Sequence, residues 1–340
     1  LQIFDGEDGA TADATANAIR YAADNGALIL QCSWGYDAGV FTSDSAWARA
    51  CSAEKDAIDY FIANAGKDNP ASPMTGGLAI FAAGNESARM PGYPASYGGV
   101  VCVTAFAPDF TPSTFTNYGQ AADIAAPGGD SDYTLDDAGT ILSTQTDAFG
   151  LYGYMEGTSM ACPHVSGVAA LGLSYAAQLR RHFTADEFKA LLCETTTPID
   201  SYMTGLKNYY RYVADVGLNQ PMQLTLANYR NQMGTGQVNA ARLLNAVSGN
   251  GKQVSFPNLY ISLGKEVKAI PANYFLGGET LTYTVSIADT AVATASMEGA
   301  KLTVKGLKAG TTRASITSSK GETHNFNITV RKSANGNGWL

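Results

Sequence analysis

The chain has 340 residues, of which 45% are hydrophobic and 15% are charged, and its formal net charge is −8. This length and apolar content allow a large core and two or more domains. The acidic balance, without any basic run or aromatic-interleaved basic patch, argues against nucleic acid as a partner. Five scattered cysteines are too few for a disulfide scaffold, and the absence of a Cys-x-x-Cys pair gives no indication of a metal site.

The cysteines fall into two groups by their sequence context. Cys32, Cys102 and Cys162 lie in apolar runs, so we expect them in the core as small apolar residues. Cys51 and Cys193 are candidates for a pair, although an odd total leaves at least one thiol free.

Helical and strand patterns alternate up to Val247, which is typical of a parallel α/β sheet. The spacing predicts a helix over 11–25 that ends at Gly26, and then a buried strand over 27–32. A second helix is predicted over 45–64, and a capping box at Thr184 opens a third that runs through Leu192.

The run from Gly157 to Gly167, Gly-Thr-Ser-Met-Ala-Cys-Pro-His-Val-Ser-Gly, predicts a helix with a serine at its start. We expect Ser159 to cap this helix, with unpaired backbone N–H groups and the positive end of the helix dipole beside it. Pro163 is expected in the first turn, and the small apolar residues from Val165 to Leu179 predict burial on most sides. Polar residues and glycines in this stretch argue for a core helix of a soluble domain and against a membrane span.

This segment resembles the nucleophile region of the subtilases, the subtilisin-like serine proteases. Four other stretches resemble landmarks of the same family in the same order, from residue 1 to about residue 247. They are Leu78-Ala79-Ile80-Phe81-Ala82-Ala83-Gly84-Asn85-Glu86, Gly92-Tyr93-Pro94-Ala95-Ser96-Tyr97 with the strand after it, Ile124-Ala125-Ala126-Pro127-Gly128, and Gly234-Thr235-Gly236-Gln237-Val238-Asn239-Ala240. The order makes the resemblance specific, whereas Gly-Thr-Ser alone would be weak.

The resemblance implies Ser159 as nucleophile and Asn85 as an oxyanion donor, together with the Ser159 N–H. Without the motif order, Asn85 would be interpreted as a turn residue after Gly84. The implied substrate-binding positions are Ser33, Trp34, Gly35, Ala82, Ala83, Gly84, Gly92 and Thr158. We expect a peptide to add as a strand along 33–35 and 82–84, with Gly92 at the base of the pocket.

Two details of this pocket are also expected from the resemblance. Small residues are needed along it because side chains would block an incoming backbone. Trp34 is larger than the expected residue, and either narrows the pocket or walls an outer subsite. The Tyr93-Pro94 bond is expected to be cis, as in the family's loop.

The sequence contains no candidate for the catalytic base. A serine hydroxyl needs an adjacent base, itself oriented by a carboxylate. His164 lies five positions beyond Ser159, which places it about 140° around and roughly 7.5 Å along a helix, so it is expected to be structural. His182 belongs to a solvated basic helix end, and His324 to a downstream module. Leu1-Gln2-Ile3-Phe4 resembles the strand that follows the family's aspartate and histidine segments.

We therefore expect these residues to be the C-terminal part of a subtilase catalytic domain, with the aspartate and histidine supplied by a missing N-terminal segment of the same precursor. The chain alone is expected to be inactive. The alternative is a protein that never had these two residues and acts in peptide binding or cell-surface adhesion. A secreted, periplasmic or cell-surface location is expected, with protein or peptide substrates.

Two insertions have no counterpart in the resemblance. Residues 128–139 carry Asp130, Asp132, Asp136 and Asp137, a spacing compatible with calcium, although a solvated acidic loop is favoured and no cofactor is assigned. Residues 198–232 carry Tyr202, Tyr209, Tyr210, Tyr212 and Tyr229, which either extend the substrate cleft or pack against the following domain.

After residue 247 the pattern changes to strict alternation. Leu281, Tyr283, Val285 and Ile287 share one face of a strand, as do Leu302 with Val304, and Phe326 with Ile328 and Val330. The stretch 289–311 resembles bacterial immunoglobulin-like repeats. The predicted organisation is a catalytic domain over 1–247, a linker over 248–252, an immunoglobulin-like β-sandwich over 253–332 and a tail over 333–340. The predicted fold is thus a subtilisin-like parallel sheet with helices on both faces, incomplete at its N-terminus, followed by an all-β sandwich.

Overall fold

A computed structural model describes residues 11–146, 150–179, 181–213, 217–249, 256–275 and 281–331. The chain divides into two compact units, Leu1–Leu243 and Leu244–Leu340. The strand expected at Leu1–Phe4, most of the predicted linker and the tail lie outside the described residues. The domain boundary predicted at residue 247 stays a prediction.

The first unit is built around a four-stranded parallel sheet. Its strand order is β1 (Ile29–Cys32), β3 (Leu78–Ala82), β4 (Val101–Phe106) and β5 (Ile124–Pro127). Every residue of β3 and β4 is buried, as expected for a parallel sheet covered on both faces. Among the described residues, β1 is an edge strand that pairs with β3 alone.

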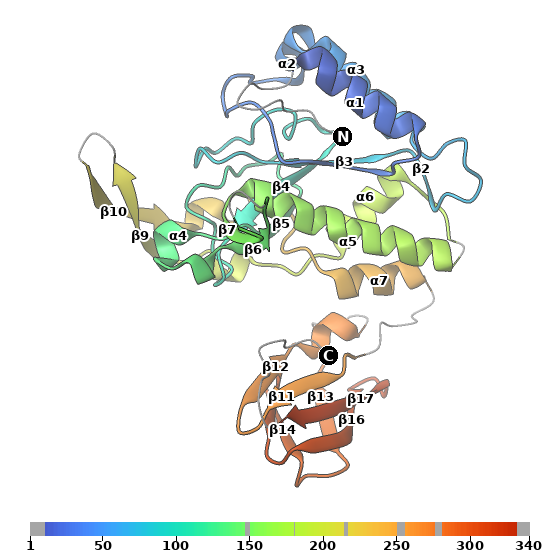
Figure 1. Cartoon of the computed structure of the whole chain (residues 1–340), viewed down its shortest axis with the longest axis vertical. Coiled ribbons are helices and arrows are strands. Elements are labelled where there is room, and N and C mark those ends of the chain that lie inside the picture. Colours follow the sequence, from blue (N-terminus) through green and yellow to red (C-terminus); the bar gives the residue numbers. More distant parts are fainter. Residues whose placement is uncertain are drawn as a thin grey trace. The chain divides into compact units, whose positions relative to one another are not determined.

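Helices cover both faces of this sheet (Figure 1). On one face lie α1 (Ala12–Asp24) and α3 (Ser52–Asn64), which pack on each other, and on the other face α5 (Thr158–Gln178) runs under all four strands. The predicted α/β architecture is therefore confirmed for this unit.

The remaining elements of the first unit are short or peripheral. They are α2 (Asp44–Ala50), β2 (Met74–Thr75), α4 (Ser131–Thr134), β6 (Ile141–Thr144), β7 (Tyr152–Met155), β8 (Phe183–Thr184), α6 (Ala185–Glu194), β9 (Leu206–Val213) and β10 (Leu218–Thr225), with 3-10 turns at Asp137–Gly139, Asp200–Tyr202 and Leu226–Tyr229. Helix α7 (Ala240–Ser248) runs across the division between the units.

The local sequence signals hold at three helix ends. The Thr11 side chain caps α1, and Gly26 adopts φ +85° immediately after the C-cap residue Asn25. At Thr184 both hydrogen bonds of the capping box are present. The helix predicted over 45–64 is wrong as a single element, because the backbone breaks at Cys51 and α2 and α3 are separate helices.

Helix α5 differs from its prediction in two ways. It begins at Thr158 after the N-cap residue Gly157, so Ser159 is its second residue and caps nothing. Pro163 lies inside the helix and not in its first turn. Burial on most sides is confirmed, but one stripe of the helix is exposed. The stripe consists of Pro163, His164, Gly167, Ala170, Leu171 and Ser174. Among the described helices, none combines the length and apolar character that a membrane crossing requires.

The 198–232 insertion forms an antiparallel hairpin of β9 and β10 that projects from the body of the first unit (Figure 1). Tyr209 and Tyr229 are buried, and the Tyr229 ring lies 4.0 Å from that of Tyr118. Tyr202, Tyr210 and Tyr212 are exposed, so both alternatives proposed for them stay open.

The acidic insertion is not a uniformly solvated loop. Asp130 is fully buried, and its Oδ2 accepts a hydrogen bond from Lys207 Nζ of β9 at 2.7 Å. Asp132 pairs with Arg211 of the same strand at 3.3 Å. Asp136 caps the next 3-10 turn. The prediction of a solvated loop is therefore wrong for Asp130, whose charge is balanced by Lys207, a residue far away in the sequence but in direct contact in the fold.

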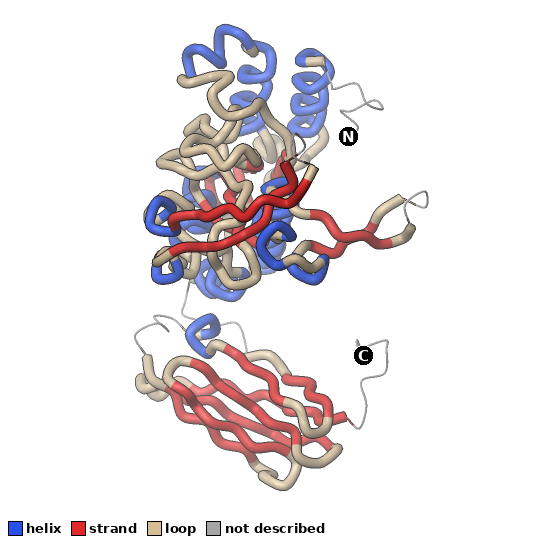
Figure 2. Tube along the Cα trace, turned by 90° about the vertical axis from the view of Figure 1, so that its left-hand side faces the viewer, coloured by secondary structure: helices blue, strands red, loops and turns tan. Residues whose placement is uncertain are grey.

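The second unit consists of two β-sheets (Figure 2) around one apolar core. The four-stranded sheet has the order β11 (Leu259–Ser262), β17 (Thr323–Arg331), β16 (Gly310–Ser318) and β13 (Tyr283–Ile287). The three-stranded sheet has the order β12 (Glu266–Ala269), β15 (Lys301–Gly306) and β14 (Ala293–Glu298). A 3-10 turn occupies Pro271–Tyr274.

The predicted alternation is confirmed in this unit. Leu302, Val304, Ile316 and Ile328 are fully buried in the shared core. His324 is nearly buried, stacks on Phe275 with ring centroids 4.4 Å apart, and accepts at Nδ1 from Phe256 N at 3.0 Å. Whether the unit belongs to the immunoglobulin-like class stays a prediction.

The cysteines follow only part of the prediction. All five are free, so the pairing of Cys51 with Cys193 is wrong. Cys32, Cys102 and Cys162 are buried, as expected for core residues. Burial is the largest of the effects that raise the pKa of Cys162 to about 11 and that of Cys193 to about 12.

Candidate active site

A cavity of about 190 Å³ lies beyond the carboxyl ends of β1 and β3, at the start of α5. It is lined by all ten site residues that the sequence predicts: Ser33, Trp34, Gly35, Ala82, Ala83, Gly84, Asn85, Gly92, Thr158 and Ser159. Three residues that sequence reasoning missed also line it, namely Tyr36, Asp37 and Glu86. Each directly extends a predicted segment, so adjacency was the signal that could have found them.

Ser159 is held by the second turn of α5 and by the end of β1. Because Pro163 has no N–H, the Ser159 carbonyl lacks its usual helical donor. The Ser33 hydroxyl donates to that carbonyl oxygen at 2.7 Å instead. The Ser159 hydroxyl donates to the Ser33 carbonyl oxygen at 3.3 Å, so the two serines are linked in both directions.

Asn85 is oriented by Thr158. Its Oδ1 accepts hydrogen bonds from Thr158 N and Thr158 Oγ1, both at 2.9 Å. Thr158 Oγ1 also accepts from Gly84 N at 3.2 Å, so the buried threonine joins α5 to the segment after β3. With Oδ1 engaged, Nδ2 is the free end of the Asn85 amide and donates to none of the described residues.

The space beside Gly157 is bounded by two unused donors. A Cβ built on Gly157 would lie 3.5 Å from Ser159 N and 3.7 Å from Asn85 Nδ2. Within the described part of the chain, the Ser159 N–H has no acceptor either. Gly157 adopts φ +144°, which disfavours any larger residue. Two N–H donors therefore lie near one position beside the N-terminus of a long helix, where the helix dipole favours negative charge.

Glycine is required at three positions of the cavity because a Cβ there would collide with other atoms of the protein. A Cβ on Gly35 would lie 2.8 Å from the Tyr93 carbonyl oxygen, and one on Gly92 only 2.1 Å from the Tyr36 carbonyl oxygen. A Cβ on Gly84 would lie 2.4 Å from Asn117 Nδ2. The protein itself therefore occupies the space that a side chain would need at these positions. The expectation that small residues leave room for a peptide backbone stays a prediction.

Within the 82–84 segment, the backbone groups of Ala83 and Gly84 already make hydrogen bonds to the protein. Ala83 N donates to Val103 O and Ala83 O accepts from Gly92 N, both at 2.9 Å. Gly84 N donates to Thr158 Oγ1 at 3.2 Å and Gly84 O accepts from Asn117 N at 3.0 Å. By contrast, the backbone groups of Trp34 and Gly35 make no hydrogen bonds within the described residues. The open backbone groups of Trp34 and Gly35 therefore make 33–35 the better candidate for pairing with a peptide.

The segment after β1 is hydrogen-bonded, through the Tyr36 hydroxyl, to the buried carboxyl group of Glu54. Glu54, 2% exposed, accepts from Trp47 Nε1 at 3.0 Å and from Tyr36 Oη at 3.3 Å. Burial raises the pKa of Glu54 above its ordinary value, and these two hydrogen bonds oppose the rise. Tyr36 N in turn donates to Tyr93 O at 2.7 Å, next to the Tyr93-Pro94 bond, which is cis as expected.

None of the three histidines, all of which lie within the described residues, hydrogen-bonds to Ser159. His164 is exposed, and its Nδ1 lies 2.8 Å from Met160 O on the same helix. His182 Nε2 lies 2.9 Å from Thr75 Oγ1. His324 belongs to the second unit. Whether the catalytic histidine comes from another segment stays a prediction.

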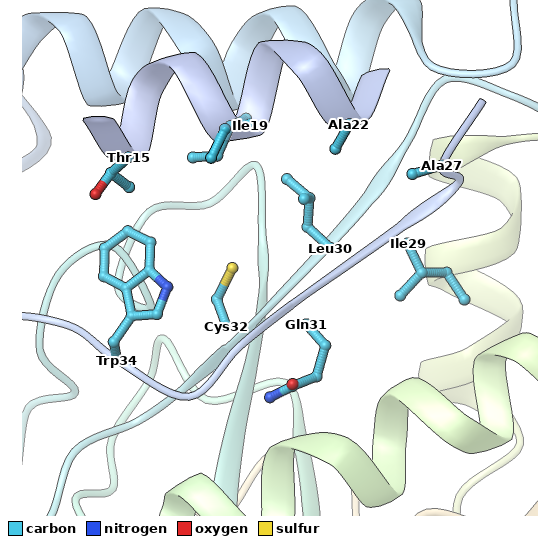
Figure 3. Close-up of a pocket in the computed structure, with 10 residues that line it drawn as sticks. Thr15, Ile19, Ala22, Ala27, Ile29, Leu30, Gln31, Cys32 and Trp34 are labelled. Atoms are coloured by element: carbon cyan, nitrogen blue, oxygen red, sulfur yellow. The ribbon is translucent and has the colours of Figure 1, made fainter. Parts of the chain in front are cut away.

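A second cavity, of about 290 Å³, lies between α1 and the edge strand β1 (Figure 3). Its lining is mostly apolar and includes Ile19, Ala22, Leu30 and Cys32. In Figure 3 Leu30 and Cys32 point toward α1, whereas Gln31 points toward α5. Trp34 lines both cavities and packs edge-on against Phe81 at 5.2 Å, so it forms part of the wall between them.

The described residues contain no group of three or more His, Cys, Asp or Glu side chains arranged to hold a metal ion. In the acidic insertion, Asp130 and Asp132 pair instead with the basic side chains Lys207 and Arg211 of β9.

Comparisons with known proteins agree with this architecture. The profile of the subtilase family matches residues 1–219. Thermitase of Thermoactinomyces vulgaris is 32% identical over 171 residues, which are 50% of this chain and 49% of thermitase. The extracellular basic protease of Dichelobacter nodosus is 39% identical over 125 residues, which are 36% of this chain and 20% of that protease. The chain thus spans about half of the length of these relatives or less.

Among solved structures, that of a lanthipeptide protease has a TM-score of 0.50 at 18% sequence identity and covers 72% of this chain and 70% of that chain, which indicates a shared fold. The family profile is the stronger finding, because it covers well over half of the chain, including both sides of the cavity. The chain belongs to the subtilase family.

Proposed function

We propose that the protein is a serine endopeptidase in which Ser159 attacks the peptide carbonyl. The observation that carries this proposal is the convergence of Ser159 N and Asn85 Nδ2 on the open space beside Gly157. An oxyanion formed by attack of Ser159 would develop in that space. Donors that are already oriented stabilise such a charge without reorganisation, which is a large part of acyl-transfer catalysis.

The reaction then proceeds by acyl transfer. The Ser159 oxygen bonds to the carbonyl carbon, a base removes the hydroxyl proton, and the proton passes to the leaving amine as the peptide bond breaks. Water hydrolyses the resulting ester and releases the acid. A peptide substrate hydrogen-bonds to the open backbone of Trp34 and Gly35, and one of its side chains enters the cavity.

The base and its orienting aspartate come from a segment of the same precursor outside these residues. Two features of the first unit support a covering segment: the apolar cavity between α1 and β1, and the exposed stripe on α5. In that stripe Leu171 is 54% exposed, an unusual position for a leucine on a helix that packs under the central sheet. Among the described residues, β1 also pairs with β3 alone.

A fluorophosphonate probe on the full-length precursor tests the nucleophile. We expect labelling of the precursor and its loss in Ser159→Ala. Ser174→Ala, on the exposed stripe of the same helix, is the matched control and keeps the label. A folded precursor without any labelling overturns the proposal. Residues 1–340 alone are expected to leave casein intact, and cleavage at an ordinary protease rate would refute the role of the additional segment.

The oxyanion position has its own test. Asn85→Ala is expected to lower kcat by about 10²–10³ with little change in KM, a magnitude taken from subtilisin, itself a subtilase. Thr158→Val keeps the shape but removes the hydroxyl that orients Asn85. Thr158→Val should therefore also lower kcat, but by a smaller factor than Asn85→Ala.

A second function is favoured by one observation: among the described residues, no histidine hydrogen-bonds to Ser159. In this alternative the protein is a non-catalytic peptide-binding or surface-adhesion protein on a subtilase scaffold. A folded, unlabelled precursor that binds peptides in the cavity would select it. A secreted, periplasmic or cell-surface location fits either function, and the second unit, which we assign to the immunoglobulin-like class, would act as a spacer or adhesive module.

A further inference from the structure

We infer that the cavity beside Ser159 selects a basic side chain, lysine or arginine, at the substrate residue whose carbonyl is attacked. This inference rests on the proposed function, because it names the substrate class of the same site. It is carried by Tyr36, Asp37 and Glu86, the three lining residues outside the predicted set.

The charge of the cavity has one sign. Asp37 and Glu86 are the only charged residues among the thirteen that line it, and no lysine, arginine or histidine is among them. Neither carboxylate forms an ion pair within the described residues. Their negative charge is therefore available to a ligand.

Glu86 is held in place by neutral donors. Its Oε1 accepts from Asn85 N at 3.1 Å, and its Oε2 accepts from Ala38 N at 3.3 Å and from Asn117 Nδ2. A Cβ built on Gly84 would lie 2.8 Å from Oε2, so the carboxylate sits against the cavity wall. These contacts fix its position but leave its charge uncompensated.

A backbone acceptor lies at the base of the cavity. The Tyr36 carbonyl oxygen would lie 2.1 Å from a Cβ on Gly92, and both residues line the cavity. This oxygen accepts no hydrogen bond from any described residue. An apolar side chain would leave it unsatisfied and desolvated, whereas an ammonium or guanidinium group supplies several donors.

The wall and the base together fit one kind of side chain. Trp34 and Ala82 offer apolar surface along which the methylene stem of lysine or arginine packs. The cationic head then reaches Asp37, Glu86 and the Tyr36 carbonyl. An acidic substrate residue would meet two carboxylates, so it is the residue most strongly rejected.

The test uses the full-length precursor in its active form and peptides that differ only at the residue before the cleaved bond. We expect kcat/KM for arginine or lysine to exceed that for leucine by about tenfold or more, and glutamate to be the poorest. Asp37→Asn should reduce the arginine-to-leucine ratio several-fold. This change isolates the charge, because the Asp37 side chain has no hydrogen-bond partner among the described residues to lose.

Asp56→Asn on the exposed side of α3 is the matched control, since it removes the same charge outside the cavity and should leave the ratio unchanged. An enzyme that is labelled by fluorophosphonate yet prefers leucine or phenylalanine overturns this inference and leaves the proposed function standing. The inference is also overturned if Asp37→Asn and Asp56→Asn have the same arginine-to-leucine ratio of kcat/KM. A folded precursor that neither cleaves nor is labelled overturns the proposed function itself.

Discussion

Glu54 shows how a single buried side chain supports the cavity from below. Its carboxyl group receives the indole of Trp47 and the hydroxyl of Tyr36, and Tyr36 forms the cavity base. No cation is paired with it among the described residues, so burial dominates and raises its pKa. Because the pKa of Glu54 is higher in the folded chain than in the unfolded chain, protonation of this carboxyl group stabilises the folded state.

The sign of the pH dependence follows directly. As pH rises above the ordinary pKa of 4.5, Glu54 ionises in the unfolded chain first, so its contribution to the free energy of unfolding falls until pH passes the raised pKa. Glu54→Gln has no ionisable group at this position, so its free energy of unfolding does not fall for this reason as pH rises. We expect the stability of Glu54→Gln relative to the native chain to increase with pH over that window and then level off. Urea unfolding of both chains between about pH 4 and about pH 8 measures it, and parallel curves would contradict the prediction.

Helix α5 illustrates how an element depends on a residue far away in the sequence. Pro163 leaves the Ser159 carbonyl without a helical donor, and Ser33 supplies one from the end of β1. Ser33→Ala is therefore expected to destabilise the first unit by about 1–3 kcal/mol. In a Pro163→Ala background the new N–H can bond to Ser159, so the same substitution should cost less.

A double-mutant cycle by urea unfolding measures this coupling. Equal costs of Ser33→Ala in the two backgrounds would show that the serine acts independently of the proline. Ser166→Ala on the same helix is a suitable reference, because its hydroxyl bonds to Cys162 O within α5 and has no part in the link to β1.

The hairpin of β9 and β10 is tied to the body of the first unit by a buried ion pair. Lys207 Nζ contacts Asp130 Oδ2 at 2.7 Å and Pro112 O at 2.6 Å, and both side chains are almost fully buried. Lys207→Met leaves the Asp130 charge unpaired and should cost about 3–5 kcal/mol. The double variant Lys207→Met with Asp130→Asn should recover part of that loss, which chemical denaturation can measure. A double variant as unstable as the sum of both single changes would contradict this account.

Elements with strong local signals were predictable from sequence, whereas contacts between distant segments were not. The helix end at Gly26, the capping box at Thr184 and the alternation from Leu281 to Ile287 depend on neighbouring residues, and all hold. The pairing of Lys207 with Asp130 joins residues 77 apart, and no periodicity indicates it. The break at Cys51 was missed because both flanking segments have helical spacing.

The order of the sequence motifs was enough to predict which residues form the candidate site, but not how they contact one another. All ten predicted residues line one cavity, but the contacts that fix several of them were not predicted. Gly35, Gly84 and Gly92 make room for the protein's own carbonyl and amide groups, and Ala83 and Gly84 already use their backbone hydrogen bonds. Such details depend on the path of residues 36–38 and on Asn117, which only the folded chain brings together.

At the scale of the whole molecule, the two units differ in architecture and have separate cores. The residues of the second core, from Phe256 to Val330, all lie beyond Gly249. We therefore expect a fragment of residues 249–331 to fold alone and to unfold cooperatively in urea, because its apolar burial does not depend on the first unit. Ile316→Ala, at a fully buried position of β16, should destabilise this fragment by about 2–5 kcal/mol.

The half-buried neighbour Ser315→Ala is the control and should change the midpoint less than Ile316→Ala. It loses only a contact with Ser286 on the solvent side. A fragment without a cooperative transition, or one in which the two substitutions are equivalent, would show that the β-unit needs the first unit to fold. In the full chain, Ile316→Ala should leave the reactivity of Ser159 unchanged, since the candidate nucleophile and every residue lining its cavity belong to the other unit.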